Sequence, residues 1–148
     1  MPKFAADRMV MRLARWLRLL GADVVADPAV SGAELLKRAR AEGRVMLTRD
    51  KRLRTAPEVF FLTSNDLRGQ LRAAIVRFHL NPRAAALTRC SRCNRPLIIV
   101  PRNLVARRVP PFVFASHERF AECAGCGRIY WPATHPERIA ALLDSIGV

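Results

Sequence analysis

Short apolar segments alternate with segments of helical periodicity over the first 80 residues. Apolar side chains gather at 3–7, 23–27, 44–50 and 59–64, which predicts four short β-strands. Residues 8–21, 32–43 and 67–78 repeat apolar side chains at the spacing of one helix face. Strands that alternate with helices are typical of a mostly parallel sheet with right-handed connections. The pattern therefore predicts an α/β domain.

The ends of these predicted helices carry residue types that stop and start helices. Gly21 and Gly43 follow the first two helices, and glycine readily takes the left-handed conformation found there. Ser64, Asn65 and Asp66 precede the third helix, and each has a side chain that can cap its first turn. We expect the helices to end and begin at these positions.

The pattern changes after residue 80. Residues 81–88, "NPRAAALT", have no regular period, and all four cysteines of the chain follow them. We expect an α/β domain over 1–86 and a small second domain over 87–148. The last segment, "HPERIAALLDSIGV", begins with a proline suited to the first turn of a helix, so we expect a short terminal helix there.

The cysteines form two C-x2-C pairs, "CSRC" and "CAGC". This spacing lets two thiolates and the amides between them wrap one tetrahedral Zn²⁺, so Cys90, Cys93, Cys123 and Cys126 are the expected ligands. A redox role would need only one pair, and disulfides are disfavoured in a cytoplasmic protein. We expect a structural zinc ribbon, because a closed site of four thiolates leaves no position for a reacting water.

The charge of the chain points to a polyanionic partner. The net charge is +14, and arginine supplies 23 of the 26 basic residues. Arginine binds phosphate through a planar, bidentate group, so nucleic acid is the expected partner, although the excess charge can also be merely solubilising. No segment has the ~20 apolar residues of a membrane span or the apolar core of a secretion signal. We therefore expect a cytoplasmic protein that does not bind membranes; the sequence gives no indication of its oligomeric state.

Two carboxylates stand at the ends of predicted strands. Asp7 follows the first strand and Asp50 the third, at the sheet edge where open α/β folds place their ligands. Two carboxylates repel each other unless a cation lies between them, and oxygen ligands suit Mg²⁺ or Mn²⁺. The alternative is that Asp7 caps a helix and Asp50 caps a turn.

Basic residues surround both aspartates, and we expect them to bind phosphate groups of a nucleic acid. A polar stripe follows Asp7 on the first helix, and a second basic cluster surrounds Asp50. The residues concerned are Arg8, Arg12, Arg15, Arg18, Arg49, Lys51 and Arg52. Their alternative role is that of an ordinary solvated face. Tyr130 and Trp131 could add a small platform for base stacking, and His135 is a candidate for substrate contact.

Five segments together resemble the Mut7-C RNase domain family. They are "FAADRMVMRLARWLRLLGADV", "LLKRARAEGRVMLTRD", "DLRGQL", and the pair "RCSRCN" and "CAGCGRIYWPATH". The resemblance implies a PIN-like three-layer α/β/α domain with a mostly parallel sheet, followed by a zinc ribbon. It also implies RNA cleavage by clustered acids with a divalent metal.

The resemblance assigns the acids residue by residue. Asp7 and Asp50 match two acids of the pattern, but Gly32 stands where the third is expected. Glu34 is then the candidate for the third acid, and Asp27 and Asp66 are weaker substitutes.

Two functions remain from these observations. The first is a metal-dependent ribonuclease that uses Asp7, Asp50 and Glu34 with Mg²⁺ or Mn²⁺. The second is a non-catalytic RNA-binding protein, in which the ribbon and the basic stripe bind nucleic acid without cleaving it. A protein-interaction adaptor fits the net charge of +14 least well.

Overall fold

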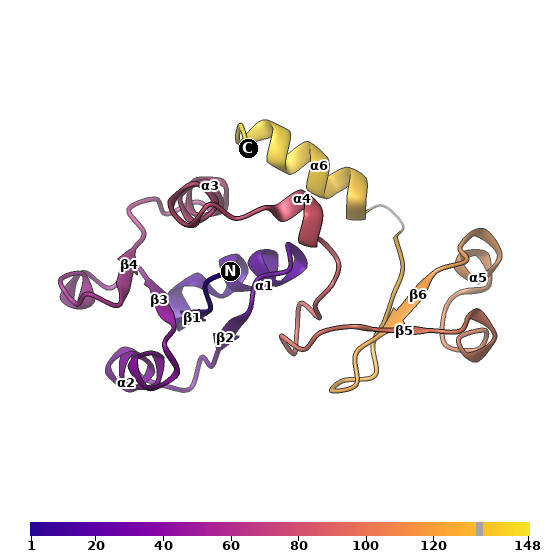
Figure 1. The fold of residues 1–148 in the computed structure, drawn as a ribbon, viewed down its shortest axis with the longest axis horizontal. Coiled ribbons are helices and arrows are strands. Elements are labelled where there is room, and N and C mark those ends of the chain that lie inside the picture. Colours follow the sequence, from indigo (N-terminus) through magenta and orange to yellow (C-terminus); the bar gives the residue numbers. More distant parts are fainter. Residues whose placement is uncertain (133–134) are drawn as a thin grey trace.

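The fold is taken from a computed structural model that describes residues 1–132 and 135–148 (Figure 1). The first part of the chain alternates strands with helices, as expected. Its elements are β1 (Phe4–Ala6), η1 (Arg8–Val10), α1 (Met11–Leu19), β2 (Val24–Ala26), α2 (Gly32–Glu42), β3 (Val45–Thr48), η2 (Lys51–Leu53), β4 (Val59–Phe61), α3 (Leu67–Phe78) and α4 (Pro82–Ala85).

The four strands form one parallel sheet in the order β2-β1-β3-β4. Alternate side chains of each strand face opposite sides of the sheet. Phe4 and Leu47 belong to a core with α1 and α3, whereas Ala5 and Met46 belong to a second core with α2. The predicted mostly parallel α/β sheet is confirmed, with helices packed on both faces.

The strand order creates a switch point between β1 and β3. From β1 the chain runs through α1 to β2 on one side, and from β2 it returns through α2 to β3 on the other side. Open α/β sheets bind ligands outside the carboxyl ends of the strands at such a point, because the flanking connections diverge there. Asp7 and Asp50 follow the two strands that border it.

Helix boundaries follow the predicted signals closely. Gly43 ends α2 with a φ of 64°, and Asp66 caps α3 by accepting from Gly69 N at 2.9 Å. Gly21 has a φ of 91°, and a Cβ there would lie 2.3 Å from Ala85 O. Gly21 therefore permits both the turn after α1 and the close approach of α4.

The second part of the chain forms a small antiparallel sheet with its own core. Its order is β5-β6-β7, and an excursion that carries one helical turn and a short helix joins the first two strands. Val105, Val113 and Phe120 are buried between this excursion and the sheet. The elements are β5 (Ile98–Val100), η3 (Arg102–Leu104), α5 (Pro111–Ser116), β6 (Phe120–Glu122) and β7 (Ile129–Tyr130).

The terminal helix α6 (His135–Ser145) returns to the first part of the chain. Ile139, Leu143 and Ile146 belong to the same core as α1 and α3, and Arg72 Nε donates to Ile146 O at 3.0 Å. Figure 1 shows α6 beside α4, away from the small sheet. The expected second domain, 87–148, thus has two parts. Residues 89–132 form the small sheet with the two cysteine pairs, called the ribbon below, and α6 packs on the core of the α/β part. No helix in the described ranges is long and apolar enough to span a membrane.

Candidate functional site

Thr48 joins the two aspartates at the carboxyl edge of the parallel sheet. Asp7 is buried, and its two carboxylate oxygens accept from the Thr48 hydroxyl and, at 2.9 Å, from Met9 N. The Thr48 hydroxyl also accepts from Asp50 N at 2.9 Å. One side chain therefore fixes the positions of both acids at the switch point.

Asp50 is held by its neighbour Arg52. The Arg52 guanidinium donates to both carboxylate oxygens of Asp50, at 3.1 and 2.9 Å, and Arg52 N donates at 3.0 Å. These hydrogen bonds hold the pKa of Asp50 below its usual range. Because the Arg52 side chain is 88% exposed, the pair costs little to open, and a stronger cation can replace the guanidinium.

Both aspartates also have the capping roles that were the alternative interpretation. Asp7 caps η1 and Asp50 caps η2, each through a backbone N–H two residues further on. Capping does not require the Thr48 link, which brings the two carboxylates to one place. The hydrogen bonds of Thr48 therefore go beyond what two independent helix caps would need.

Glu34 is exposed in the first turn of α2, whose N-cap Ser31 accepts from Glu34 N at 3.2 Å. Within the described ranges, Glu34 does not join Asp7 and Asp50 in a group of ligand atoms close enough to hold a metal ion. Gly32 lies beside Asp50, because a Cβ built on it would lie 3.9 Å from Asp50 Oδ2. The position where an acid is expected is thus beside Asp50, and it carries no side chain.

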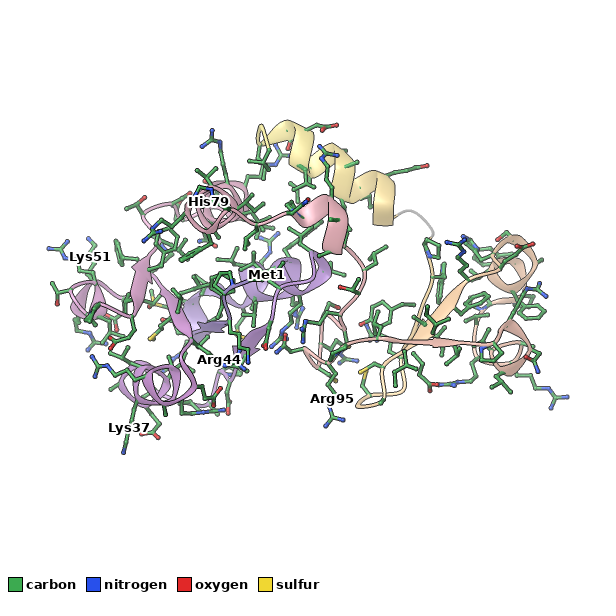
Figure 2. The ribbon with its side chains drawn as sticks, in the orientation of Figure 1. Met1, Lys37, Arg44, Lys51, His79 and Arg95 are labelled. Atoms are coloured by element: carbon green, nitrogen blue, oxygen red, sulfur yellow. The ribbon has the colours of Figure 1, made fainter. Side chains whose placement is uncertain are left out.

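Arg8 and Arg12 line a cavity of about 200 Å³ next to Asp7. Asn65, just before α3, and Gln70, near the start of this helix, also line the cavity. Arg15 and Lys51 are also exposed, and Figure 2 shows Lys51 at the periphery of the α/β domain. Four of the seven predicted phosphate-binding residues are therefore open to solvent without an acidic partner among the described residues, while Arg52 is exposed but paired.

Arg18 requires a correction. It was expected on the solvated stripe of α1, but it is only 5% exposed. Its guanidinium donates to Val24 O at 2.8 Å and to the carbonyls of Ser91 and Arg92 at 3.1 and 3.0 Å. These bonds join α1 to the first cysteine pair, so Arg18 holds two parts of the chain together and is not available to phosphate.

Arg49 also has a structural role that its position in the sequence did not reveal. Its Nη1 donates to the carbonyls of Leu62, Thr63 and Ser64 at 3.0, 2.9 and 2.5 Å. These carbonyls follow β4, so Arg49 fixes the loop that leads into α3. We expect it to position the cavity wall more than to bind RNA.

The exposed part of the arginine stripe gives a test of nucleic-acid binding. Arg12→Ala combined with Arg15→Ala should weaken RNA binding and flatten the plot of log affinity against log salt by roughly one unit per lost phosphate contact. Lys37→Ala with Arg38→Ala removes the same charge from the exposed face of α2 and is the matched control. Fluorescence anisotropy over a range of salt concentrations measures both. Equal slopes for the two double variants would make the stripe an ordinary solvated face.

The four cysteine sulfurs converge on one point in the ribbon. Their Sγ atoms all lie within 4.8 Å of one another, and those of Cys90 and Cys126 are 3.8 Å apart. Thiolates around Zn²⁺, with bonds of about 2.3 Å in a tetrahedron, lie about 3.8 Å apart. The four cysteines are therefore positioned to bind a metal ion, and their soft ligands and spacing fit zinc.

The two cysteine pairs have the same backbone geometry. In each pair, the N–H of the first cysteine donates to the carbonyl five residues later, and its own carbonyl accepts from the residue four later, all at 2.8–3.0 Å. That fourth residue is Asn94 or Gly127, with φ of 65° and 71°. Asparagine and glycine tolerate this conformation best, so "CSRCN" and "CAGCG" carried a signal beyond the cysteine spacing.

Four thiols this close cannot all lose their protons unless a cation is present. Burial raises the pKa of Cys90, but hydrogen bonds with Tyr130 and backbone N–H groups outweigh burial and lower this pKa to about 6. The interaction with Cys126, together with burial, raises the pKa of Cys93 to about 12. One thiolate thus suppresses the ionisation of its neighbours, and a divalent cation would remove this conflict.

The first cysteine pair docks on the edge of the parallel sheet. The Asn94 side chain accepts from Val24 N at 2.8 Å and donates to Asp23 Oδ1 at 2.7 Å. Although burial opposes it, hydrogen bonds from Arg44 and Asn94 lower the pKa of Asp23, which stays ionised. With Arg18, these contacts tie the predicted zinc site to β2 and α1. The side chain of His135 lies outside the part that the structure describes.

Comparison with known proteins agrees with the resemblance seen in the sequence. No curated protein and no solved structure matches the chain. The family model of the Mut7-C RNAse domain matches residues 2–143, from just before β1 into α6. Because this match spans nearly the whole chain, the protein belongs to the Mut7-C RNAse domain family.

Proposed function

We propose that the chain is a metal-dependent ribonuclease whose reaction centre lies at the switch point between β1 and β3. Membership of the Mut7-C RNAse domain family indicates an RNA- or nuclease-related role. The observation that carries the proposal is the link from Asp7 through Thr48 to Asp50, with the arginine-lined cavity beside it.

Asp7 and Asp50 are the residues that would hold Mg²⁺ or Mn²⁺. A carboxylate offers about four lone-pair sites, so their present hydrogen bonds leave acceptor capacity for a cation. When bound, such a metal polarises a phosphodiester and lowers the pKa of a water. Asp7 is kept in place by Met9 N and Thr48, so the chain fixes this ligand before substrate arrives.

The basic cavity supports RNA as the substrate. Arg8 follows Asp7 directly and Arg12 lies five residues after it, and both line the cavity with Asn65. Guanidinium groups bind phosphate oxygens in a bidentate manner and orient the backbone without reading bases. The proposed substrate is therefore an RNA chain whose phosphates lie along α1, next to the two aspartates.

The direct test is cleavage of a labelled single-stranded RNA with and without added Mg²⁺ or Mn²⁺. EDTA would also remove zinc from the cysteines, so the metal-free arm uses buffer without added divalent ions, and zinc content is measured in both arms. We expect cleavage only after Mg²⁺ or Mn²⁺ is added. If varied RNAs bind but are not cleaved, the chain is the non-catalytic RNA-binding protein.

That second function has its own support in the structure. Gly32 leaves the position beside Asp50 without a carboxylate. The charge of Asp50 itself is neutralised by its pair with the Arg52 guanidinium. A site with two acids binds metal less tightly than one with three or four, because fewer negative charges face the cation. If the chain does cleave RNA, we therefore expect weak metal binding and slow cleavage.

Gly32→Asp tests whether this missing acid limits the site. A carboxylate at position 32 would lie next to Asp50, and Leu53 Cδ1, 3.0 Å from the new Cβ, would have to shift by a few tenths of an ångström. We expect Mn²⁺ affinity and cleavage to rise at least about tenfold, because the new carboxylate adds a negative charge that faces the cation, and outer contacts alone change affinity by ~10- to 100-fold. Gly32→Asn has the same size without the charge and is the control. Mn²⁺-dependent thermal stabilisation and initial cleavage rates measure the effect; equal values for both variants would contradict it.

A further inference from the structure

The ribbon contains a second cavity, which the proposed ribonuclease site does not use. It has a volume of about 420 Å³, within the ~300–1,000 Å³ range of cavities that bind small organic groups. Its lining is largely apolar, with Ile99, Ala121 and Tyr130 from the sheet and Leu87 and Pro132 from the connections to the α/β part. Arg119 is the one charged residue among those that line it within the described part of the chain.

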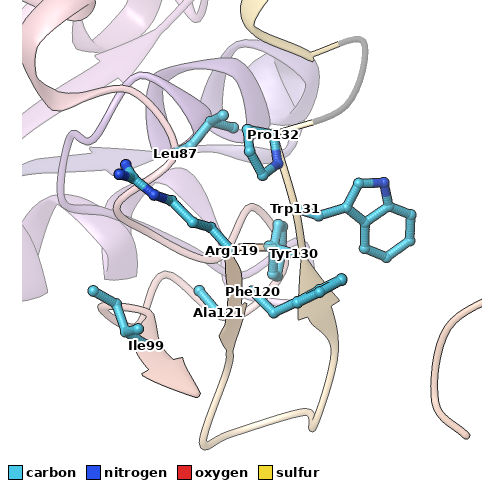
Figure 3. A pocket seen from close by; sticks show the side chains of 8 residues that line it. All are labelled: Leu87, Ile99, Arg119, Phe120, Ala121, Tyr130, Trp131 and Pro132. Atoms are coloured by element: carbon cyan, nitrogen blue, oxygen red, sulfur yellow. The ribbon is translucent and has the colours of Figure 1, made fainter. Parts of the chain in front are cut away.

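The sheet register explains why the cavity exists. Ile99 pairs with Ala121, and Ala121 pairs with Tyr130, so these three side chains stand in one row on the same face of the sheet. The central member is alanine, which leaves space between its larger neighbours. Arg119, two residues before Ala121, follows the same alternation onto this face (Figure 3).

Tyr130 is the aromatic wall of this cavity, and the first cysteine pair holds it in place. Its hydroxyl lies 3.0 Å from Cys90 Sγ and accepts from Ser91 N at 3.2 Å. A ring fixed in this way loses little conformational freedom when a ligand stacks on it. Trp131 also lines the cavity, but it packs against the core of the ribbon, and in Figure 3 its ring points away from Ile99 and Arg119. Of the expected two-residue platform, Tyr130 is therefore the residue that shares a face of the sheet with Ile99.

We propose that this cavity binds a nucleobase of single-stranded RNA, with the base against Tyr130 and Ile99 and the flanking phosphate on Arg119. The inference rests on the proposed function, because it assumes that the chain acts on RNA. An apolar cavity with an aromatic wall accepts any base, since every base has a π face, and a guanidinium at the edge attracts the backbone. Duplex RNA would be excluded, because its bases are paired and stacked.

Charge complementarity favours RNA over a protein segment as the occupant. Residues 89–148 carry nine basic and four acidic side chains, a net charge of +5. Arg92, Arg95 and Arg128 are exposed near the cysteine pairs, and Figure 2 shows Arg95 projecting from the ribbon. A peptide or a second copy of this strongly basic chain would have to approach against that charge, whereas RNA would be attracted by it.

Ile99→Glu is the sharpest test, because Ile99 is 87% exposed and its replacement leaves the core intact. Leu104→Glu is the matched control, since Leu104 is also an exposed apolar residue of the ribbon but lies outside the cavity. Both variants lose the same net charge. Anisotropy with a labelled single-stranded RNA of about 12 nucleotides, chosen within the ~4–16 nucleotide range of single-strand sites, is compared with an abasic chain of equal length. No Mg²⁺ or Mn²⁺ is added.

We expect Ile99→Glu to weaken binding of the single-stranded RNA about tenfold, and Leu104→Glu less than about threefold, because only Ile99→Glu removes a surface on which a base packs. The abasic chain should bind both variants equally. Equal losses of RNA affinity in both variants would overturn the nucleobase site, because the added negative charge alone would then explain the loss. A change of oligomeric state with Ile99→Glu in sedimentation would overturn it in favour of a second copy.

The outcome separates this inference from the proposed ribonuclease activity. Selective loss with Ile99→Glu in a chain that never cleaves RNA would support the nucleobase site and refute the ribonuclease. Metal-dependent cleavage together with equal RNA affinity of Ile99→Glu and Leu104→Glu would support the ribonuclease and refute the nucleobase site. A wild-type chain that binds no single-stranded RNA would overturn both.

Discussion

Asp7→Asn is expected to lower RNA cleavage by roughly 100-fold or more while RNA binding persists. The substitution removes the charge that would hold Mg²⁺ or Mn²⁺, and loss of a direct ligand should exceed the ~10- to 100-fold effect of an outer contact. Asp50→Asn should have a similar effect on cleavage. Removal of either negative charge beside a phosphate site can even tighten RNA binding, because it removes repulsion.

Both variants should fold, so lost activity will not reflect lost structure. At position 7 an amide oxygen can still accept from Met9 N, and at position 50 asparagine caps a turn about as well as aspartate. The lost pair with Arg52 is exposed and contributes little to the free energy of unfolding.

The measurement pairs initial cleavage rates with equilibrium binding for wild type, Asp7→Asn, Asp50→Asn and the control Asp144→Asn. Asp144 is exposed on α6 and pairs with Arg83, so its substitution makes the same charge change away from the sheet edge. If either Asp7→Asn or Asp50→Asn cleaved RNA at the wild-type rate, the two-aspartate centre would be refuted.

The sequence predicted those parts of the fold that depend on local pattern. The parallel strands and α1, α2 and α3 followed from periodicity, and Asp66 and Gly43 marked real helix ends. The short helices α4 and α5 were missed because four to six residues are too few to show a period. Both begin with proline, at Pro82 and Pro111, which was a usable signal for a first turn.

Contacts between distant segments were beyond the reach of local pattern. Arg18 was grouped with Arg12 and Arg15 by helical spacing, yet at 3.6 residues per turn it lies about 120° around the helix from Arg12. The ribbon covers the side of α1 that carries Arg18, and the sequence of α1 alone does not predict this contact. Likewise, the apolar face of α6 predicts burial but not which core receives it.

In the candidate site, too, local pattern predicted some features and contacts between distant segments determined the others. The strand-end positions of Asp7 and Asp50 were readable, since parallel strands bring their carboxyl ends to one edge. The role of Thr48 was not, because its hydroxyl matters only once β1 and β3 are adjacent. The geometry of Gly32 likewise depends on how α2 packs against η2.

Zinc removal should have the largest effect on stability. We expect one equivalent of zinc in the purified, reduced protein, and Cys93→Ser or Cys126→Ser should release it and unfold residues 89–132. A structural Zn²⁺ site contributes about 10–16 kcal/mol of apparent binding free energy, which the small core around Val105 and Phe120 cannot replace. The parallel sheet, with its separate cores, should persist together with α6.

Ala124→Ser is the control, because Ala124 is exposed between Cys123 and Cys126 and the substitution adds a hydroxyl without removing a thiolate. Metal analysis gives the zinc content, and hydrogen exchange locates the unfolded segment. Loss of the ribbon should also free Arg18 and the edge of β2, which the first cysteine pair covers, so exchange should rise at Val24 N, the donor to Asn94. A structural metal would be ruled out if the fresh, reduced protein contained no zinc, or if hydrogen exchange over 89–132 were unchanged in Cys93→Ser. If the ribbon amides stayed protected in Cys93→Ser while Val24 N exchanged faster, the cysteines would serve only to dock the ribbon on β2.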